Sequence, residues 1–75
     1  MNSTLDKSIA IVKKALGTKN IDESSEINKT NKWDSLGQLR VIMEVENFLK
    51  KKIKFSDIEK INSVKKISIF IDQNQ

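Results

Sequence analysis

The feature that most constrains this chain is a run of apolar residues at helical spacing near its middle. Apolar side chains recur every three or four positions there, at Leu36, Leu39, Ile42, Met43, Val45 and Leu49. This spacing predicts an amphipathic helix from Ser35 to Leu49 or Lys50, because a strand would alternate instead. Val41 and Phe48 widen the stripe, so we expect contacts with other helices on more than one side. The polar side is expected to carry Gln38, Glu44 and Asn47.

The residues just before this helix suit a helix start. The stretch Trp33-Asp34-Ser35-Leu36-Gly37 offers side-chain oxygens that can accept unpaired backbone N–H groups. Ser35 and Gln38 together form an S-x-x-Q capping box, and Asp34 is an alternative cap. Trp33 suits a hydrophobic staple or a core anchor at this entry into the helix. On local sequence alone, capping is a sufficient role for Ser35.

A second amphipathic segment lies near the N-terminus. Ser3 and Asp6 approximate a capping box before a helix over 4–16, and Gly17 is placed to end it. Its inward face is expected to carry Leu5, Ile9, Val12 and Leu16. Residues 18–32 follow without periodicity, as a long polar loop pinned by Ile21 and Ile27 or as a loop with a short helix near 22–26.

The C-terminal third predicts two further short helices. Ile53 and Phe55 are expected to anchor the connection in the core, and Ser56 to cap a helix over 57–61. Ser63 is expected to cap a last helix over 64–71. Residues 67–71 also alternate like a strand, but no second strand is evident to pair with them. The prediction is therefore an all-α four-helix bundle with a long first loop and a short third helix, in one domain over 1–75.

The composition narrows the chemistry available to this chain. With 75 residues, no Cys and no His, it lacks thiolate metal ligands and the commonest general base and zinc ligand. Gly17 and Gly37 are the only glycines, so no phosphate-cradling loop is present. A nucleophilic enzyme needs a base beside its nucleophile. We therefore expect a protein that is not an enzyme and whose chemistry is supplied by a cofactor or a partner.

Charge and hydropathy restrict the possible partners of the chain less than composition restricts its chemistry. The formal net charge is +4, but Arg40 is the only arginine among 14 basic residues. A basic patch could form from Lys50, Lys51, Lys52, Lys54, Lys65 and Lys66. Because arginine dominates base and phosphate readout, a small nucleic-acid-binding module is the weaker alternative. No apolar run approaches a membrane span and no signal-peptide pattern opens the chain, so we expect a cytoplasmic protein without membrane insertion.

In this context the chain resembles the acyl carrier protein family. The attachment motif of that family is Asp-Ser-Leu at the start of the second helix, and it stands here as Asp34-Ser35-Leu36. The apolar spacing after the motif and the stretch 59–64 also resemble the family. The likeness extends over nearly the whole chain, including its length, its long first loop and its helix order.

The resemblance implies specific chemistry. A phosphopantetheinyl transferase would move 4′-phosphopantetheine from coenzyme A onto the Ser35 hydroxyl, and would itself supply Mg²⁺ and a base. The thiol of that arm would carry an acyl or aminoacyl group as a thioester, loaded and used by partner enzymes of a biosynthetic pathway. Asp34 would serve recognition by the transferase. We expect the carrier to be a monomer that binds no nucleic acid.

Two further sets of residues follow from the resemblance. Partner recognition would involve Arg40, Met43, Glu44 and Glu46. An acyl cleft between the second and third helices would be lined by Leu39, Ile42, Phe55, Ile58 and Ile61, with Met43 beside them, although ordinary core packing is the favoured role for most of these residues taken one by one.

This chain also departs from the family in two ways. Carriers of fatty-acid synthesis are strongly acidic, whereas this chain is basic and has Arg40 where an acid is common, which predicts a dedicated pathway with its own partners. Gly37 is reminiscent of D-alanyl carriers, so aminoacyl cargo stays open. Its alternative role is to let another backbone approach closely.

Overall fold

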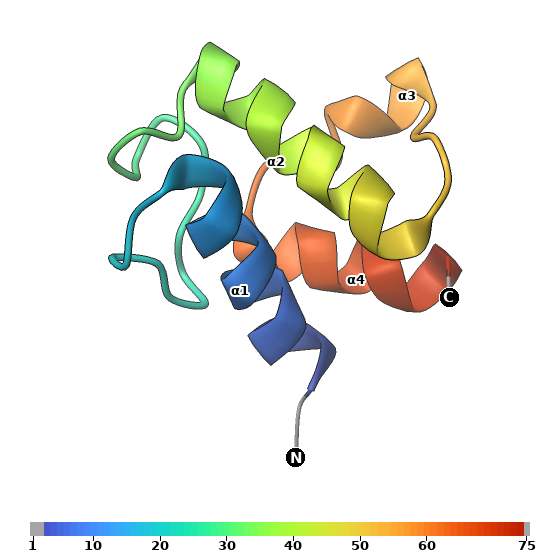
Figure 1. The fold of residues 1–75 in the computed structure, drawn as a ribbon, viewed down its shortest axis with the longest axis horizontal. Helices are drawn as coiled ribbons and strands as arrows, with labels where there is room; N and C mark the ends of the chain where they lie inside the picture. Colours follow the sequence, from blue (N-terminus) through green and yellow to red (C-terminus); the bar gives the residue numbers. More distant parts are fainter. Residues whose placement is uncertain (1–2, 75) are drawn as a thin grey trace.

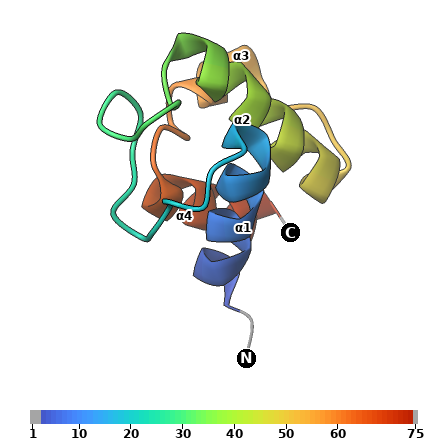
Figure 2. The same ribbon diagram turned by 60° about the vertical axis from the view of Figure 1, so that its left-hand side comes forward.

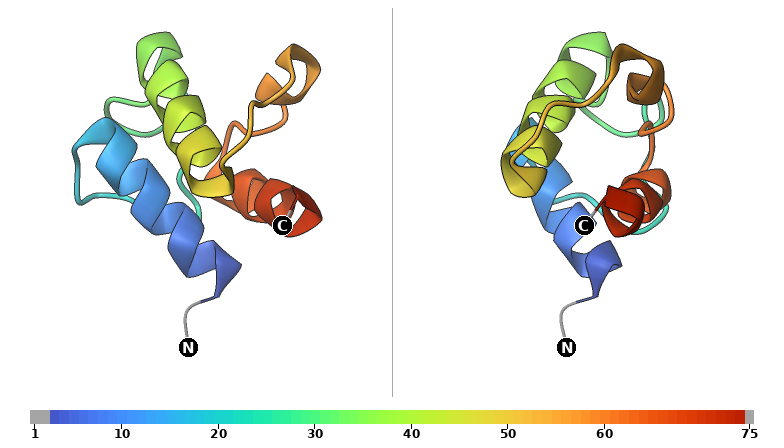
Figure 3. Two further views of the ribbon diagram at one scale, coloured as in Figure 1. Left: turned by 45° about the vertical axis from the view of Figure 1, so that its right-hand side comes forward. Right: turned by 90° about the vertical axis from the view of Figure 1, so that its right-hand side faces the viewer.

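The computed structural model describes residues 3–74, which contain four helices and no strand. The helices are α1 (Thr4–Leu16), α2 (Ser35–Leu49), α3 (Phe55–Ile58) and α4 (Val64–Asn74). α1 packs against both α2 and α4, and α3 lies on the opposite side of α2 from α1 (Figures 1 and 3). The predicted all-α architecture, with a long first loop and a short third helix, is confirmed for these residues. None of the four helices has the length and apolar composition that a membrane crossing requires.

The core forms where three helices and one tryptophan meet. Each long helix contributes side chains at helical spacing, including Val12 from α1, Val41 and Val45 from α2, and Ile67 from α4, all fully buried. Trp33, in the loop before α2, is 1% exposed and is among the largest fully buried side chains. The prediction that Trp33 anchors the core is therefore confirmed, and its burial fixes how the chain enters α2.

Local capping determines the bounds of α1. The Ser3 hydroxyl accepts a hydrogen bond from the Asp6 N–H at 3.1 Å. Gly17 ends the helix with φ 66°, in the left-handed region that glycine adopts without a Cβ clash. The Thr4 hydroxyl also donates to the Asp72 carboxylate at 2.6 Å, which ties the start of α1 to the end of α4.

The loop between α1 and α2 passes beside α4 (Figure 2), and buried side chains and backbone hydrogen bonds fasten it at several points. Ile21 is buried and Ile27 is partly buried, so the two predicted anchors are confirmed. Two backbone hydrogen bonds, from Ile27 N–H to Asn62 C=O at 2.9 Å and from Val64 N–H to Ser25 C=O at 3.0 Å, join the loop to the start of α4. The segment is therefore a pinned loop, as one prediction held, and the other prediction, a short helix near 22–26, is wrong.

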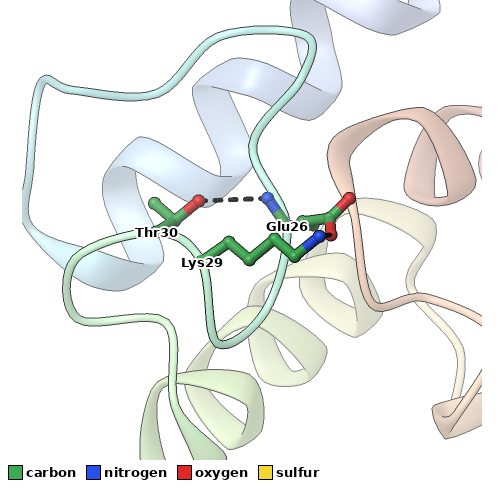
Figure 4. A network of polar contacts seen from close by, with 3 residues as sticks. All are labelled: Glu26, Lys29 and Thr30. Carbon is green, nitrogen blue, oxygen red and sulfur yellow. Dashed lines mark hydrogen bonds and ion pairs between the residues drawn. The ribbon is translucent and has the colours of Figure 1, made fainter.

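A polar network holds the tip of this loop (Figure 4). The Thr30 hydroxyl accepts a hydrogen bond from the Glu26 N–H at 3.0 Å. The Lys29 ammonium lies 3.2 Å from the Glu26 carboxylate, across a single turn of chain. Side chains thus satisfy backbone groups that no helix satisfies here, which is how an irregular segment keeps one conformation.

The third and fourth helices differ from the sequence predictions in their bounds. α3 begins at Phe55 rather than Asp57, and Lys54 is its N-cap without a side-chain hydrogen bond, so the prediction of Ser56 as cap is wrong. Phe55 is 85% exposed and is not a core anchor, because a single helical turn has no buried face here. Ser63 does cap α4, accepting from the Lys66 N–H at 3.2 Å, and α4 continues past Ile71 to Asn74.

Candidate functional site

The candidate site is the first turn of α2. Asp34 is the N-cap, and its carboxylate accepts a hydrogen bond from the Gly37 N–H at 2.9 Å. The predicted capping box of Ser35 and Gln38 is therefore wrong, and the alternative cap, Asp34, is confirmed. Ser35 is the first helical residue and is exposed, and within residues 3–74 no hydrogen bond engages its hydroxyl. Because Asp34 caps the helix, the Ser35 hydroxyl is not used for capping and stays accessible.

The backbone around Ser35 presents unpaired donors. The first N–H groups of a helix have no partner within the helix. Asp34 satisfies that of Gly37, whereas those of Ser35 and Leu36 have none among the described residues. These groups and the positive end of the helix dipole favour a phosphate attached nearby. The carboxylate of Asp34 opposes this effect, so it does not act as a phosphate ligand.

A buried hydrogen-bond network holds the first turns of α2 on the side that faces the core. The Trp33 indole N–H donates to the Gln38 side-chain oxygen at 2.6 Å. The Gln38 amide nitrogen donates to the carbonyl of Ile61 at 3.0 Å and approaches that of Ile58 at 3.4 Å. Gln38 therefore joins the loop before α2 to the end of α3 and the segment after it.

The placement of Gln38 corrects the sequence prediction. Gln38 was expected on the polar side of α2, yet it is 8% exposed. The signal was present in the spacing, because Gln38 shares a helical face with Val41, Ile42 and Val45, all of which are buried. Its amide matches the hydrogen-bonding groups around it, and no buried polar side-chain atom in the described part of the chain lacks a partner.

Gly37 is explained by packing in the same turn. A Cβ at this position would overlap the carbonyl oxygen of Lys32 and would lie 2.9 Å from a methyl group of Leu16. Lys32 itself has a positive φ of 69°, so the loop folds back tightly onto the helix. Glycine is therefore required for close approach of two backbone segments, as one of the two sequence interpretations held.

One face of α2 beside Ser35 is apolar and open to solvent. Leu36, Leu39 and Met43 are 61%, 57% and 61% exposed, and Arg40 lies exposed among them. The prediction that α2 contacts more than one helix is confirmed by its packing against α1 and α4, but these three side chains stay exposed. α1 and α4 pack against α2 without covering them.

The other two predicted recognition residues are engaged within the protein. Glu44 lies 3.8 Å from the Lys14 ammonium and is only 24% exposed at its side chain. Glu46 accepts a hydrogen bond from the Ile53 N–H at 2.9 Å and so fastens the connection after α2. Arg40 and Met43 are therefore the more accessible members of the predicted set.

The predicted acyl-cleft residues fall into three environments. Ile42 and Ile61 belong to the core, Ile58 is partly buried against it, and Leu39 and Phe55 face solvent. They border the region between α2 and α3, where Gln38 connects the two elements. Within residues 3–74 no cluster of three or more acidic side chains is placed to hold a metal ion.

Comparisons with known proteins return no matching family model and no matching curated protein.

Proposed function

We propose that this chain is a carrier protein of the acyl carrier type, not itself an enzyme, that bears a 4′-phosphopantetheine arm on Ser35. The observation that carries the proposal is the position of Ser35 on the first turn of α2, exposed and without a hydrogen bond to its hydroxyl within residues 3–74. A modifying enzyme needs such a hydroxyl on a rigid element, within reach of its own active site. The resemblance of Asp34-Ser35-Leu36 to the family motif supports the same assignment.

The residues around Ser35 fit such an arm. The unpaired N–H groups of Ser35 and Leu36 favour the phosphodiester electrostatically. Trp33 and Gln38 hold the turn from beneath, so the attachment point keeps a fixed orientation relative to α2. When attached, the arm supplies the thiol on which cargo is carried as a thioester, a group this chain lacks because it has no cysteine.

In the attachment step, the Ser35 oxygen forms a bond to the β-phosphorus of coenzyme A. The bond from that phosphorus to the nucleotide breaks, and adenosine 3′,5′-bisphosphate leaves. The phosphopantetheinyl transferase supplies the base that takes the hydroxyl proton, together with Mg²⁺. Asp34 contributes by capping the helix with its own carboxylate, which leaves Ser35 free to react.

Partner enzymes would dock on the exposed face of α2 that begins at Ser35. Leu36, Leu39 and Met43 offer apolar contact there, and Arg40 adds a positive charge. Charge of this sign selects partners with acidic patches and disfavours the basic patches that acidic carriers attract. We therefore propose a dedicated biosynthetic pathway rather than housekeeping fatty-acid synthesis.

The cargo is proposed to be acyl, with aminoacyl cargo as the second candidate. Gly37 was the sequence feature that suggested a D-alanyl carrier. Its contact with the Lys32 backbone gives it a packing role that any cargo would permit. Leu39 and Phe55, exposed beside α2 and α3, provide apolar surface where an acyl chain would find contact.

The direct test is the intact mass after incubation with coenzyme A, Mg²⁺ and a promiscuous phosphopantetheinyl transferase. We expect one phosphopantetheine increment, absent in Ser35→Ala and retained in Ser56→Ala, where the serine is also exposed but lies in α3. A folded protein without any increment, also after incubation with lysate of the source organism, would remove the proposal. An increment retained in Ser35→Ala would assign the site elsewhere.

The dedicated pathway is tested on the modified protein. A housekeeping malonyl transferase should load it poorly at low salt, where charge repulsion is strongest. Arg40→Glu should improve loading, while Lys19→Glu, an equal charge change in the first loop, should not. Efficient loading of the unaltered protein would contradict this part of the proposal.

A further inference from the structure

A second surface with binding character lies between α3 and α4. Two hollows of about 530 and 150 Å³ share Asp57, Phe70 and Asn74 in their linings, so they are neighbours and together make up one hollowed surface. The cleft is bounded by α3, by α4 and by the connection that follows α2. We refer to it as the α3–α4 cleft.

The rim of the α3–α4 cleft is strongly basic. Lysines line both parts of it: Lys51, Lys52 and Lys54 border the smaller hollow, and Lys60 and Lys66 border the larger. Asp57 is the one acidic side chain among the described lining residues, and it lies 3.5 Å from the Lys60 ammonium. The unbalanced charge is therefore positive, which favours an anionic occupant.

Apolar side chains line part of the cleft, beside the polar Gln73 and Asn74. Phe70 is partly buried and lines both hollows, and Leu49 and Ile53 line the smaller one. Ile69, the neighbour of Phe70 in α4, is 57% exposed and lines the larger hollow. Lysines around these apolar side chains match a partner that combines carboxylates with aliphatic or aromatic anchors.

We propose that the α3–α4 cleft binds an acidic segment of a partner protein, which inserts an apolar side chain over Phe70 and Ile69. A concave surface suits a peptide segment, whereas a membrane surface is bound by an apolar face that projects into the bilayer. Nucleic acid is disfavoured because, among the described lining residues, there is no arginine and the one aromatic, Phe70, is partly buried rather than an open stacking platform.

This surface is separate from the candidate attachment site. Lys51 to Lys54, at the smaller hollow, follow the C-terminal end of α2, roughly 22 Å along the axis of this 15-residue helix from Ser35 at its start. Asp57 and Lys60, at the larger hollow, belong to the segment that Gln38 joins to α2, so this part of the cleft is nearer to Ser35. The described lining of either hollow includes neither Ser35 nor the exposed face of α2, and binding in the cleft does not depend on the proposed function.

The test is a titration of the isotopically labelled protein with a synthetic helical peptide that has Glu on one face and Leu on the other. Backbone amide shifts are expected at Lys66, Ile69 and Phe70 and along 51–54. The affinity should fall about tenfold or more in the double variant Lys52→Glu/Lys54→Glu. The matched control, Lys13→Glu/Lys19→Glu, makes the same charge change at exposed positions outside the cleft and should retain the affinity within about twofold.

Three comparators make the proposal refutable. The same peptide with Lys in place of Glu, phosphatidylglycerol vesicles and generic double-stranded DNA should each shift these amides less than the acidic peptide does. Absence of binding at millimolar peptide and low salt, equal losses in the two double variants, or stronger binding to vesicles or DNA would each overturn the proposal. Ser35→Ala should bind the peptide normally, so failure of the carrier assignment and failure of this proposal are distinguishable.

Discussion

The two connections that flank α2 differ in a way their secondary structure does not suggest. The loop before α2 has no regular helix, yet it contains the buried Trp33 and Ile21 and is joined to α4 by backbone hydrogen bonds. The connection after α2 includes the helix α3, yet α3 has no buried residue and no side-chain cap. Regular structure and tertiary anchoring are therefore separate properties in this protein.

This difference in anchoring bears on the proposed function, because Ser35 follows the firmly anchored loop. The anchored side holds the turn that bears Ser35, through Trp33 and Gln38, so the proposed attachment point has a fixed position. On the other side, α3 has no buried residue of its own, so few buried contacts oppose movement of this single turn, although Ile61 just after it is fully buried. Four changes should break or sharpen this contrast, beginning with the largest expected effect.

Removing the Gln38 amide should cause the largest loss on the anchored side. Gln38→Ala leaves the indole N–H of Trp33 and the carbonyl of Ile61 unpaired in the core, and should lower the free energy of unfolding by about 2–4 kcal/mol. Urea denaturation measures it. Gln73→Ala, at an exposed position of α4, is the control and should be nearly neutral. Equal effects of the two changes would contradict the role assigned to the network.

Adding a single methyl group at Gly37 should test the tight approach of the loop to α2. Gly37→Ala must displace the Lys32 carbonyl or Leu16, and should destabilise the fold by about 1–3 kcal/mol despite the better helix propensity of alanine. Thermal unfolding reports the change. A stabilised variant would show that the loop yields without strain, and would make the anchored side less rigid than inferred.

Truncating the exposed aromatic of α3 should leave stability nearly unchanged. Phe55 is 85% exposed, so Phe55→Ala should alter the free energy of unfolding by less than about 0.5 kcal/mol. Ile61→Ala, at a fully buried position just after α3, should by contrast cost about 2–5 kcal/mol. The same denaturation experiment compares both. A large loss from Phe55→Ala would mean that α3 is packed more firmly than its burial indicates.

The smallest expected effect is a pH dependence of the anchored loop. Hydrogen bonds from the Ser24 hydroxyl and the Ser24 backbone N–H lower the pKa of Asp22 below its ordinary value of 3.8. A lowered pKa in the folded state means that the ionised carboxylate stabilises the fold above pH 3.8, and that this contribution is lost as the pH falls through the folded-state pKa. Asp22→Asn should therefore flatten the acid limb of the unfolding profile and leave the neutral region almost unchanged. A pH profile identical to that of the unaltered protein would show that ionised Asp22 does not contribute to stability.

Much of this fold follows from short-range sequence signals. The bounds of α1 depend on Ser3 and Gly17, and those of α2 on Asp34 and a local apolar period, so interactions within about four residues along the chain were sufficient to predict them. The cap of α4 at Ser63 was predicted for the same reason. The sequence predicted a cap at the start of α2, but it did not decide whether Asp34 or Ser35 supplies it.

Only the tertiary structure decided which side of each helix is covered. Periodicity identifies apolar positions, yet Ile42 is buried and Leu39 is exposed on the same helix, because α1 and α4 cover one face and α3 is too short to cover the other. The same long-range packing placed Gln38 inside and made Gly37 a point of close backbone approach. The sequence alone thus determined the bounds of α1 and α2 and the start of α4. Contacts between distant segments determined the network beneath Ser35 and the basic cleft, because neither is encoded within a single element.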